Sequence, residues 1–204
     1  MKKKINVFVH GANGKMGQIL TSLINKDKLL NLSSLKDADI VVDFSSEEGL
    51  LKILSICLKR KLPLISGTTG LSESTYQKIW EASLSIYIIH NENFSEGIKE
   101  IKQMLYGISS LLKVSKIIIE ECHNISKKDM PSGTSKMLSS ILFSRFGVKP
   151  EIISNRTNQN IGGMHNIILK LPNQIIEIKH RANSKKIYAI GALNEVKFWY
   201  KHGK

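Results

Sequence analysis

Residues 5–17 read INVFVHGANGKMG, a short run of β-branched and apolar side chains that leads into three glycines at the spacing G-x-x-G-x-x-G. Apolar residues then recur at positions 19, 20, 23 and 24, a spacing typical of one helix face. A strand, a glycine turn and a helix are the context in which backbone approaches a pyrophosphate and helix N–H groups face it. The segment predicts dinucleotide binding by Gly11, Ala12, Asn13, Gly14, Lys15 and Met16, with a plain tight turn as the alternative.

The chain continues with alternating strand and helix patterns. Residues 38–44, 62–66 and 85–90 have the apolar character of buried strands, and residues 47–60 and 71–83 have helical spacing. This alternation is typical of a parallel sheet with helices on its faces. We therefore expect an α/β domain over residues 1–94.

The pattern changes after residue 94. We expect helices over 97–112 and 132–146, a strand over 116–122, and further strands over 166–171, 174–180 and 187–192. These elements predict a second, α+β domain with an open mixed or antiparallel sheet over residues 95–183. Residues 184–204 are expected to return to the first domain.

Composition narrows the range of functions. Of the 204 residues, 42% are hydrophobic and 23% charged, and 26 of the 30 basic residues behind the net charge of +13 are scattered lysines. Without interleaved aromatics or a nucleic-acid-binding module, this charge does not favour a nucleic-acid partner. No apolar run approaches the ~20 residues of a membrane span. With only Cys57 and Cys122 there is no thiol metal motif, and we expect a cytoplasmic protein.

The acidic residue that commonly holds the adenosine ribose, ~20 residues after the glycines, is hard to place. Asp37 and Asp39 have about the right spacing, but they precede the VVDF strand. Only residues 29–35 remain for everything between the first helix and that strand. We expect an abbreviated domain, and the choice between NADH and NADPH stays open.

Two further polar loops follow predicted strands, at the edge where open α/β sheets bind ligands. The small residues of the first loop would let a flat nicotinamide ring lie against backbone, whereas the alternative is a glycine-bounded turn. The cofactor-binding residues expected in the two loops are Gly67, Thr68, Thr69, Asn91, Glu92, Asn93 and Phe94.

Residues 120–134, EECHNISKKDMPSGT, carry the strongest candidates for catalysis. His123 lies at the tip of a predicted strand and can exchange a proton near neutral pH, and Lys127 supplies a positive charge or a second proton. Pro-Ser-Gly-Thr opens the next predicted helix, whose N–H groups suit a carboxylate. The alternative is a structural surface histidine beside one of many solvated lysines.

Two other histidines lie near or within the later strands. We interpret His165 and His180 as satisfied, partly buried side chains, with a contribution to the substrate cavity as the alternative. The six histidines have no paired carboxylates at metal-ligand spacing, so we expect no metal site.

These motifs together resemble those of bacterial 4-hydroxy-tetrahydrodipicolinate reductases, long called dihydrodipicolinate reductases. The resemblance covers nearly the whole chain in order. It rests on VHGANGKMG at 9–17, VVDFS at 41–45, SGTTG at 66–70, NENFS at 91–95, EECHNISKKDMPSGTS at 120–135, GGMH at 162–165 and EIKHRANSKKIYAIGA at 177–192.

The resemblance implies an abbreviated Rossmann domain that binds NADH or NADPH, a mixed-sheet domain that binds a cyclic, unsaturated dicarboxylate, and a homotetramer formed through those sheets. It further implies that His123 is the proton donor and acceptor and Lys127 the second proton donor. Gly133 and Thr134 would cradle a substrate carboxylate. Asn124 stands where the family usually has a second, substrate-contacting histidine.

The leading hypothesis is a working reductase of the diaminopimelate and lysine pathway. Two departures from the family pattern are Glu92, where small residues are common, and the lack of an acidic residue before His165. The alternatives are an NAD(P)-dependent dehydrogenase of another small carboxylate and a nucleotide-binding module without turnover.

Overall fold

The computed structural model describes residues 4–159 and 161–203 and divides into two compact units. One unit runs to Phe94 and resumes at Tyr188, and the other spans Ser95–Ile187. No helix among the described residues is long and apolar enough to cross a membrane.

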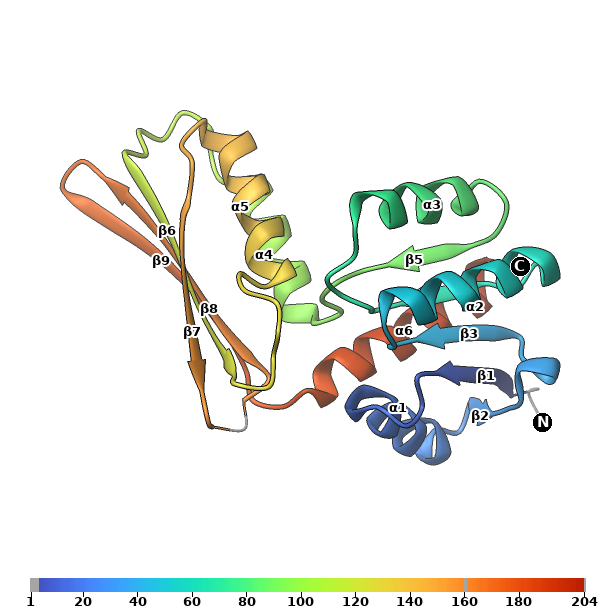
Figure 1. Cartoon of the computed structure of the whole chain (residues 1–204). Helices are drawn as coiled ribbons and strands as arrows, with labels where there is room; N and C mark the ends of the chain where they lie inside the picture. Colours follow the sequence, from blue (N-terminus) through green and yellow to red (C-terminus); the bar gives the residue numbers. More distant parts are fainter. Residues whose placement is uncertain (1–3, 160, 204) are drawn as a thin grey trace. The chain divides into compact units, whose positions relative to one another are not determined.

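The first unit is built on a parallel sheet with the strand order β2-β1-β3-β4-β5 (Figure 1). Its strands are β1 (Ile5–His10), β2 (Leu30–Leu32), β3 (Ile40–Asp43), β4 (Leu64–Ser66) and β5 (Ile88–His90). Its helices are α1 (Lys15–Lys26), α2 (Glu47–Arg60), α3 (Glu73–Ser83) and α6 (Lys186–His202), of which α6 begins two residues before the unit resumes. The predicted α/β class is confirmed.

Apolar layers cover both faces of this sheet. Helices α1 and α6 pack on one face, with Leu20 and Val196 among the buried residues, and α2 and α3 pack on the other, with Leu50 and Ile79. Because both faces are covered, strand β3 is buried along its whole length, which explains the apolar residues Ile40, Val41 and Val42 that precede Asp43.

The short segment between α1 and β3 contains a strand, β2, whose presence the sequence left uncertain. Strand β2 pairs with β1 over three residues, and a 3-10 turn over Leu35–Asp37 then leads directly into β3. Asp39 accepts a hydrogen bond from the backbone N–H of Asn6, near the start of β1. It therefore lies at the amino edge of the sheet, away from the edge that carries the glycine turn.

The predicted strand over residues 187–192 is wrong, because these residues belong to helix α6. Ala189, Ala192, Leu193 and Val196 are buried, and their spacing follows the helical period. Gly191 allows a close approach, since a Cβ there would lie 1.8 Å from the backbone oxygen of Phe94. Residues 187–192, IYAIGA, contain the residue types common in strands, over a window too short to decide between strand and helix.

The second unit is a mixed sheet with the order β7-β6-β8-β9, in which β6 pairs parallel with β7 and the other pairs are antiparallel. Its strands are β6 (Lys116–Asn124), β7 (Glu151–Thr157), β8 (Gly163–Leu171) and β9 (Gln174–Ala182), and its helices are α4 (Glu96–Gly107) and α5 (Gly133–Phe146). Both helices pack on one face of the sheet around a buried apolar cluster that includes Leu105 and Leu142 (Figure 1). The predicted α+β mixed sheet is confirmed.

Gly17 in α1 lies at a close backbone contact of the first unit, and Gly107 in α4 of the second unit is a matched control. A Cβ at Gly17 would lie 2.2 Å from the backbone oxygen of Gly11, whereas one at Gly107, the last residue of α4, meets nothing within 4 Å. We expect Gly17→Ala to lower Tm by roughly 3–10 °C because backbone must move to relieve the overlap. Gly107→Ala should leave Tm unchanged or slightly raised. Thermal unfolding followed by circular dichroism checks both, and equal Tm values would contradict the packing described.

Candidate active site

The carboxyl ends of the parallel strands form one polar row. His10, Asp43, Ser66 and His90 are successive partners across β1, β3, β4 and β5. Each is the last residue of its strand, so the loops that follow begin at the same edge. The structure thus brings together the three loops that the sequence singled out.

A buried carboxylate ties this edge together. Asp43 has no exposed surface and accepts hydrogen bonds from the hydroxyls of Ser66 at 2.9 Å and Thr68 at 2.7 Å. It also accepts from Ser45 and lies 2.8 Å from Nδ1 of His10. Since burying an unpaired charge is costly, these partners are what allow a carboxylate here, and they hold the strand ends in register.

The glycine turn is shaped by close backbone approaches. Gly11 has a φ of +81°, and a Cβ there would lie 2.6 Å from the backbone oxygen of Phe44. The N–H of Gly14 donates to the oxygen of Gly11 at 3.0 Å. Helix α1 then starts without a side-chain cap and without an acidic residue in its first turn, so its positive end suits an anion.

In the second loop, the side chain of Thr68 faces inward. Its hydroxyl donates to Asp43, its backbone N–H donates to the hydroxyl of Ser66 at 3.3 Å, and its backbone oxygen lies 2.9 Å from Nε2 of His90. Gly67 packs on Phe44, where a Cβ would lie 2.2 Å from the ring. Thr69, which follows, is partly exposed.

Residues 91–94, which form the third loop, make several contacts within the chain. Asn91 accepts a hydrogen bond from the backbone N–H of Asn93, and Phe94 is buried in the apolar core. The hydroxyl of Tyr76 donates to the carboxylate of Glu92. Burial and this carboxylate together raise the pKa of Tyr76.

In the second unit, the helix-covered face of the sheet changes from apolar to polar along the strands. Ile117 and Ile119 on β6 are followed on the same face by Glu121 and His123. Arg156, His165 and His180 are the corresponding polar residues on the neighbouring strands β7, β8 and β9. The polar cluster lies at the carboxyl end of β6.

Glu121 fastens the start of α5 to the end of β6. Its buried carboxylate accepts the backbone N–H of Ser132 at 3.1 Å from both oxygens and the hydroxyl of Ser135 at 2.6 Å. Arg156 lies 3.5 Å away. Burial by itself would raise the pKa of the Glu121 carboxyl, but the hydrogen bonds from Ser132 and Ser135 outweigh burial and hold it at about 2.

His123 is a neutral imidazole beside this carboxylate. It is 4% exposed, and its Nδ1 lies 3.8 Å from Oε2 of Glu121. Burial lowers the pKa of His123 to about 4, although Glu121 opposes the shift. The uncharged ring can take up a proton, and an added anion beside it would favour the charged form.

Lys127 is held near His123 by a turn and by a carboxylate. Its backbone N–H donates to the oxygen of Asn124 at 2.9 Å, and its Nζ lies 2.8 Å from Oδ2 of Asp129. Arg156 reaches the same loop from β7 and donates to the backbone oxygens of Lys127 at 3.3 Å and Asp129 at 2.5 Å. The loop is thereby clamped against the sheet.

The three residues expected to touch substrate have different surroundings. Asn124 donates to the backbone oxygen of Gln159 and accepts from Ser126, each at 3.0 Å, so its amide is engaged at both ends. Gly133 is the first residue of α5 and its N–H donates to the carboxylate of Asp129. Thr134 follows and is 6% exposed.

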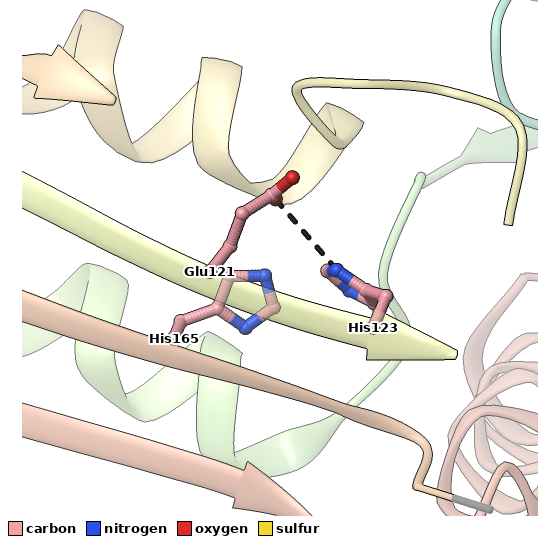
Figure 2. Close-up of side chains that lie close together, drawn as sticks. All are labelled: Glu121, His123 and His165. Carbon is pink, nitrogen blue, oxygen red and sulfur yellow. Dashed lines mark ion pairs between the residues drawn. The ribbon is translucent and has the colours of Figure 1, made fainter. Parts of the chain in front are cut away.

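The potential metal-ligating atoms of Glu121, His123 and His165 lie within 4.8 Å of one another, so these residues were considered as a metal site (Figure 2). The hydrogen bonds from Ser132 and Ser135 already occupy the carboxylate, and the guanidinium of Arg156 adds a positive charge beside it. Both features oppose a cation, so we do not assign a metal here.

Two family models match most of the chain. Residues 31–94 match the model described as dihydrodipicolinate reductase, N-terminus, and residues 97–204 match that described as dihydrodipicolinate reductase, C-terminus. The chain belongs to the dihydrodipicolinate reductase family. It is therefore an oxidoreductase of a family that uses a nicotinamide dinucleotide.

Named relatives agree with this assignment. The 4-hydroxy-tetrahydrodipicolinate reductase of Wigglesworthia glossinidia brevipalpis is 34% identical, over 93% of this chain and 85% of that protein. The one from Caldanaerobacter subterraneus subsp. tengcongensis is 31% identical, over 95% of this chain and 92% of that protein. A solved dipicolinate-bound dihydrodipicolinate reductase from Paenisporosarcina sp. TG-14 shares the fold, with a TM-score of 0.72 at 15% identity over 95% of this chain and 94% of that one.

Asp43 and Glu121 stand inside quoted motifs, but the sequence did not single them out; an acidic residue that follows apolar residues on a strand is the signal that marks them. The sequence singled out His165 and His180 without placing them in the site, although they continue the alternation of inward-facing residues on β8 and β9. Arg156 carries no local signal, because its role depends on the pairing of β7 with β6.

The interpretation of His165 as a satisfied, partly buried histidine is wrong. Its side chain is 1% exposed, and neither ring nitrogen has a hydrogen-bond partner among the described residues. Burial lowers the pKa of His165 to about 3, and His123 contributes to this shift. The ring is therefore neutral at physiological pH.

Because of its buried histidines, we expect the protein to be less stable at mildly acidic pH than at neutral pH. The pKa values of about 4 for His123 and about 3 for His165 lie below the 6.5 of an unfolded chain. The unfolded state therefore binds more protons as pH falls below 6.5, and stability is lost from there toward pH 4. We expect a lower Tm at pH 5 than at pH 7.5. His165→Phe should reduce that difference, and the exposed His202→Phe should not; an unchanged Tm from pH 7.5 to pH 5 in the wild type would contradict the burial described.

Proposed function

We propose that this reductase converts 4-hydroxy-tetrahydrodipicolinate to tetrahydrodipicolinate in diaminopimelate and lysine biosynthesis, with NADH or NADPH as the hydride donor. Family membership supports the reaction class. The observation that carries the residue assignment is the clustering of His123, Lys127 and the start of α5 at the end of β6. The proposal places the reaction in the cytoplasm.

The first unit is proposed as the dinucleotide-binding domain. The fit rests on the turn at Gly11 and Gly14, where backbone approaches closely, and on the uncapped, acid-free start of α1 at Lys15. Phosphates would bind over residues 11–16, and the loops at 67–69 and 91–94 would receive the nicotinamide end. When bound, the cofactor supplies a hydride. No acidic residue follows β2 directly, so the choice between the two cofactors is left to measurement.

The second unit is proposed as the substrate-binding domain. The carboxylate of Asp129 contacts both Nζ of Lys127 and the N–H of Gly133. The N–H of Gly133, which we assign to a substrate carboxylate, thus already binds a carboxylate of the chain. Thr134 and Asn124 complete the proposed binding residues.

The proton chemistry is assigned to His123 and Lys127. The neutral ring of His123 accepts or returns a proton, and Glu121 beside Nδ1 favours the charged form of that ring. A bound dicarboxylate adds negative charge and raises the pKa of His123 further. Lys127 supplies the second proton and offsets the charge of the substrate.

Removing either group tests this assignment. We expect His123→Gln and Lys127→Ala each to lower kcat by ~10²–10⁴-fold, because each removes a positioned proton donor or acceptor. NADH and NADPH oxidation would be measured with substrate formed in the cuvette from pyruvate and aspartate semialdehyde. Cofactor binding, followed by nicotinamide fluorescence, should be retained.

Matched controls are available on the surface. His202→Gln and Lys128→Ala replace the same residue types at exposed positions and should keep wild-type turnover. Wild-type rates in both site variants would remove these residues from the mechanism. No turnover by the wild type with either cofactor, despite binding, would contradict the proposed reaction.

A homotetramer through the second unit's sheet is part of the proposal. The face of that sheet opposite α4 and α5 exposes Ile153 (38%), Met164 (38%) and Ile175 (60%), on β7, β8 and β9 respectively. Exposed large apolar side chains on an uncovered sheet face are typical of an interface between subunits. The two outer strands, β7 and β9, both contribute.

Charges on this face should break the assembly. We expect the double variant Ile153→Lys/Ile175→Lys to sediment as a smaller species than the wild type, which should sediment as a tetramer. Phe143→Lys, at a 54% exposed position on α5, should leave the assembly intact. A monomeric wild type in analytical ultracentrifugation would contradict the tetramer.

A further inference from the structure

Asp129 places a carboxylate of the chain inside the proposed substrate site. Its Oδ2 lies 2.8 Å from Nζ of Lys127, and its carboxylate accepts a hydrogen bond from the N–H of Gly133. Its negative charge also favours the charged form of the ring of His123. One side chain thus acts on three of the groups that we assign to the substrate and to proton transfer.

The electrostatics of the start of α5 explain why a carboxylate lies there. The first N–H groups of a helix attract an anion, and the first turn of α5 contains no acidic residue. Lys127 adds a positive charge beside the same carboxylate. Asp129, four residues before Gly133, therefore supplies the negative charge that a bound dicarboxylate would bring.

The architecture of the loop does not require this carboxylate. Arg156 holds the loop through the backbone oxygens of Lys127 and Asp129. Glu121 fastens the start of α5 through the backbone N–H of Ser132, whose hydroxyl caps the helix. Both ends of the segment are therefore fixed by groups other than the side chain of Asp129.

The ion pair is also accessible to solvent. The side chains of Lys127 and Asp129 keep 25% and 23% of their surface exposed, whereas that of Glu121 is fully covered. Water can replace a hydrogen bond that a partly exposed carboxylate gives up, but it cannot reach a covered one. Asp129 can therefore move away from Gly133 at a cost that Glu121 could not bear.

We propose that Asp129 is an internal competitor of the substrate carboxylate, and that it leaves the N–H of Gly133 when the substrate binds there. Two carboxylates at one N–H would repel each other, so the two exclude one another. The exchange replaces one charge-assisted hydrogen bond by another and adds little net affinity. Because Gly133 is taken as a substrate-binding residue, the proposal rests on the proposed function, and it deepens that function by naming the residue that sets the affinity.

The same competition assists the release of product. When a dicarboxylate leaves, the side chain of Asp129 returns to Gly133, so that the N–H is not left without an acceptor. Removing the carboxylate should therefore tighten the binding of a dicarboxylate. A side chain that only fixed the loop, or that itself bound the substrate, would have the opposite effect.

Asp129→Asn tests the competition, because it removes the charge and keeps an oxygen that can accept from Gly133. The probe is pyridine-2,6-dicarboxylate, an unreactive cyclic dicarboxylate, titrated by calorimetry with saturating NADH or NADPH. We expect its Kd to fall about tenfold in the variant, since the competing charge-assisted bond is lost. KM for the substrate should fall in the same proportion, and kcat should not rise.

A matched control removes the same charge elsewhere in the second unit. Glu100→Gln, at an exposed position on α4, should keep the wild-type Kd for the probe. Asp129→Asn should keep the wild-type Kd for the dinucleotide. An unchanged or higher Kd for the probe in Asp129→Asn would overturn the proposal, as would a failure of both proteins to bind the probe.

Crystal structures separate displacement from simple charge repulsion. Without the probe, Asp129 of the wild type should accept from the N–H of Gly133; with it, a probe carboxylate should take that N–H and Asp129 should face solvent. Tighter binding by the variant, with Asp129 still at Gly133 in the wild-type complex, would overturn the proposal. These measurements need no turnover, so an inactive wild type would contradict the proposed function while binding and structure still decide the role of Asp129.

Discussion

The buried carboxylate of Glu121 is the interaction on which the catalytic end of the second unit depends. A charge with 1% exposure is tolerated only when hydrogen bonds replace its water, and the start of α5 supplies them through Ser132 and Ser135. The same bonds set where the helix begins relative to β6. Because His123 follows two residues later on the same face of β6, the carboxylate also sets the charge that this ring experiences.

The first unit also has a buried, hydrogen-bonded carboxylate at the carboxyl ends of its strands. Asp43 is fully buried and accepts hydrogen bonds from the hydroxyls of Ser45, Ser66 and Thr68, so that the chain segments that follow β3 and end β4 share one acceptor. In both units a buried carboxylate follows apolar residues on the same strand, Asp43 at the end of β3 and Glu121 three residues before the end of β6. The hydrogen bonds that satisfy it are made by residues of the functional loops, which couples the stability of the fold to the geometry of the site.

The arginines of this lysine-rich chain have a distinct structural role. Of the four present, Arg60 donates to two backbone oxygens, Arg145 donates twice to one, and Arg156 holds the loop of Lys127 and Asp129. A planar guanidinium with five N–H groups can bridge carbonyls in a fixed geometry, whereas an ammonium acts as a point charge. Among the cations that give the net charge of +13, Arg60, Arg145 and Arg156 are therefore structural, because their side chains hold backbone segments in place.

The sequence by itself determined most of the order of strands and helices, the glycine turn around Gly11 and the candidates His123 and Lys127, because each lies in a continuous stretch with a characteristic pattern. It misassigned residues 187–192, where a short run with Ile and Tyr has residue types common in strands but lies in helix α6. Only the tertiary structure decided that Arg156 and His165 belong beside His123. Their positions follow from the pairing of β7 and β8 with β6, and such register depends on contacts between residues far apart in the chain.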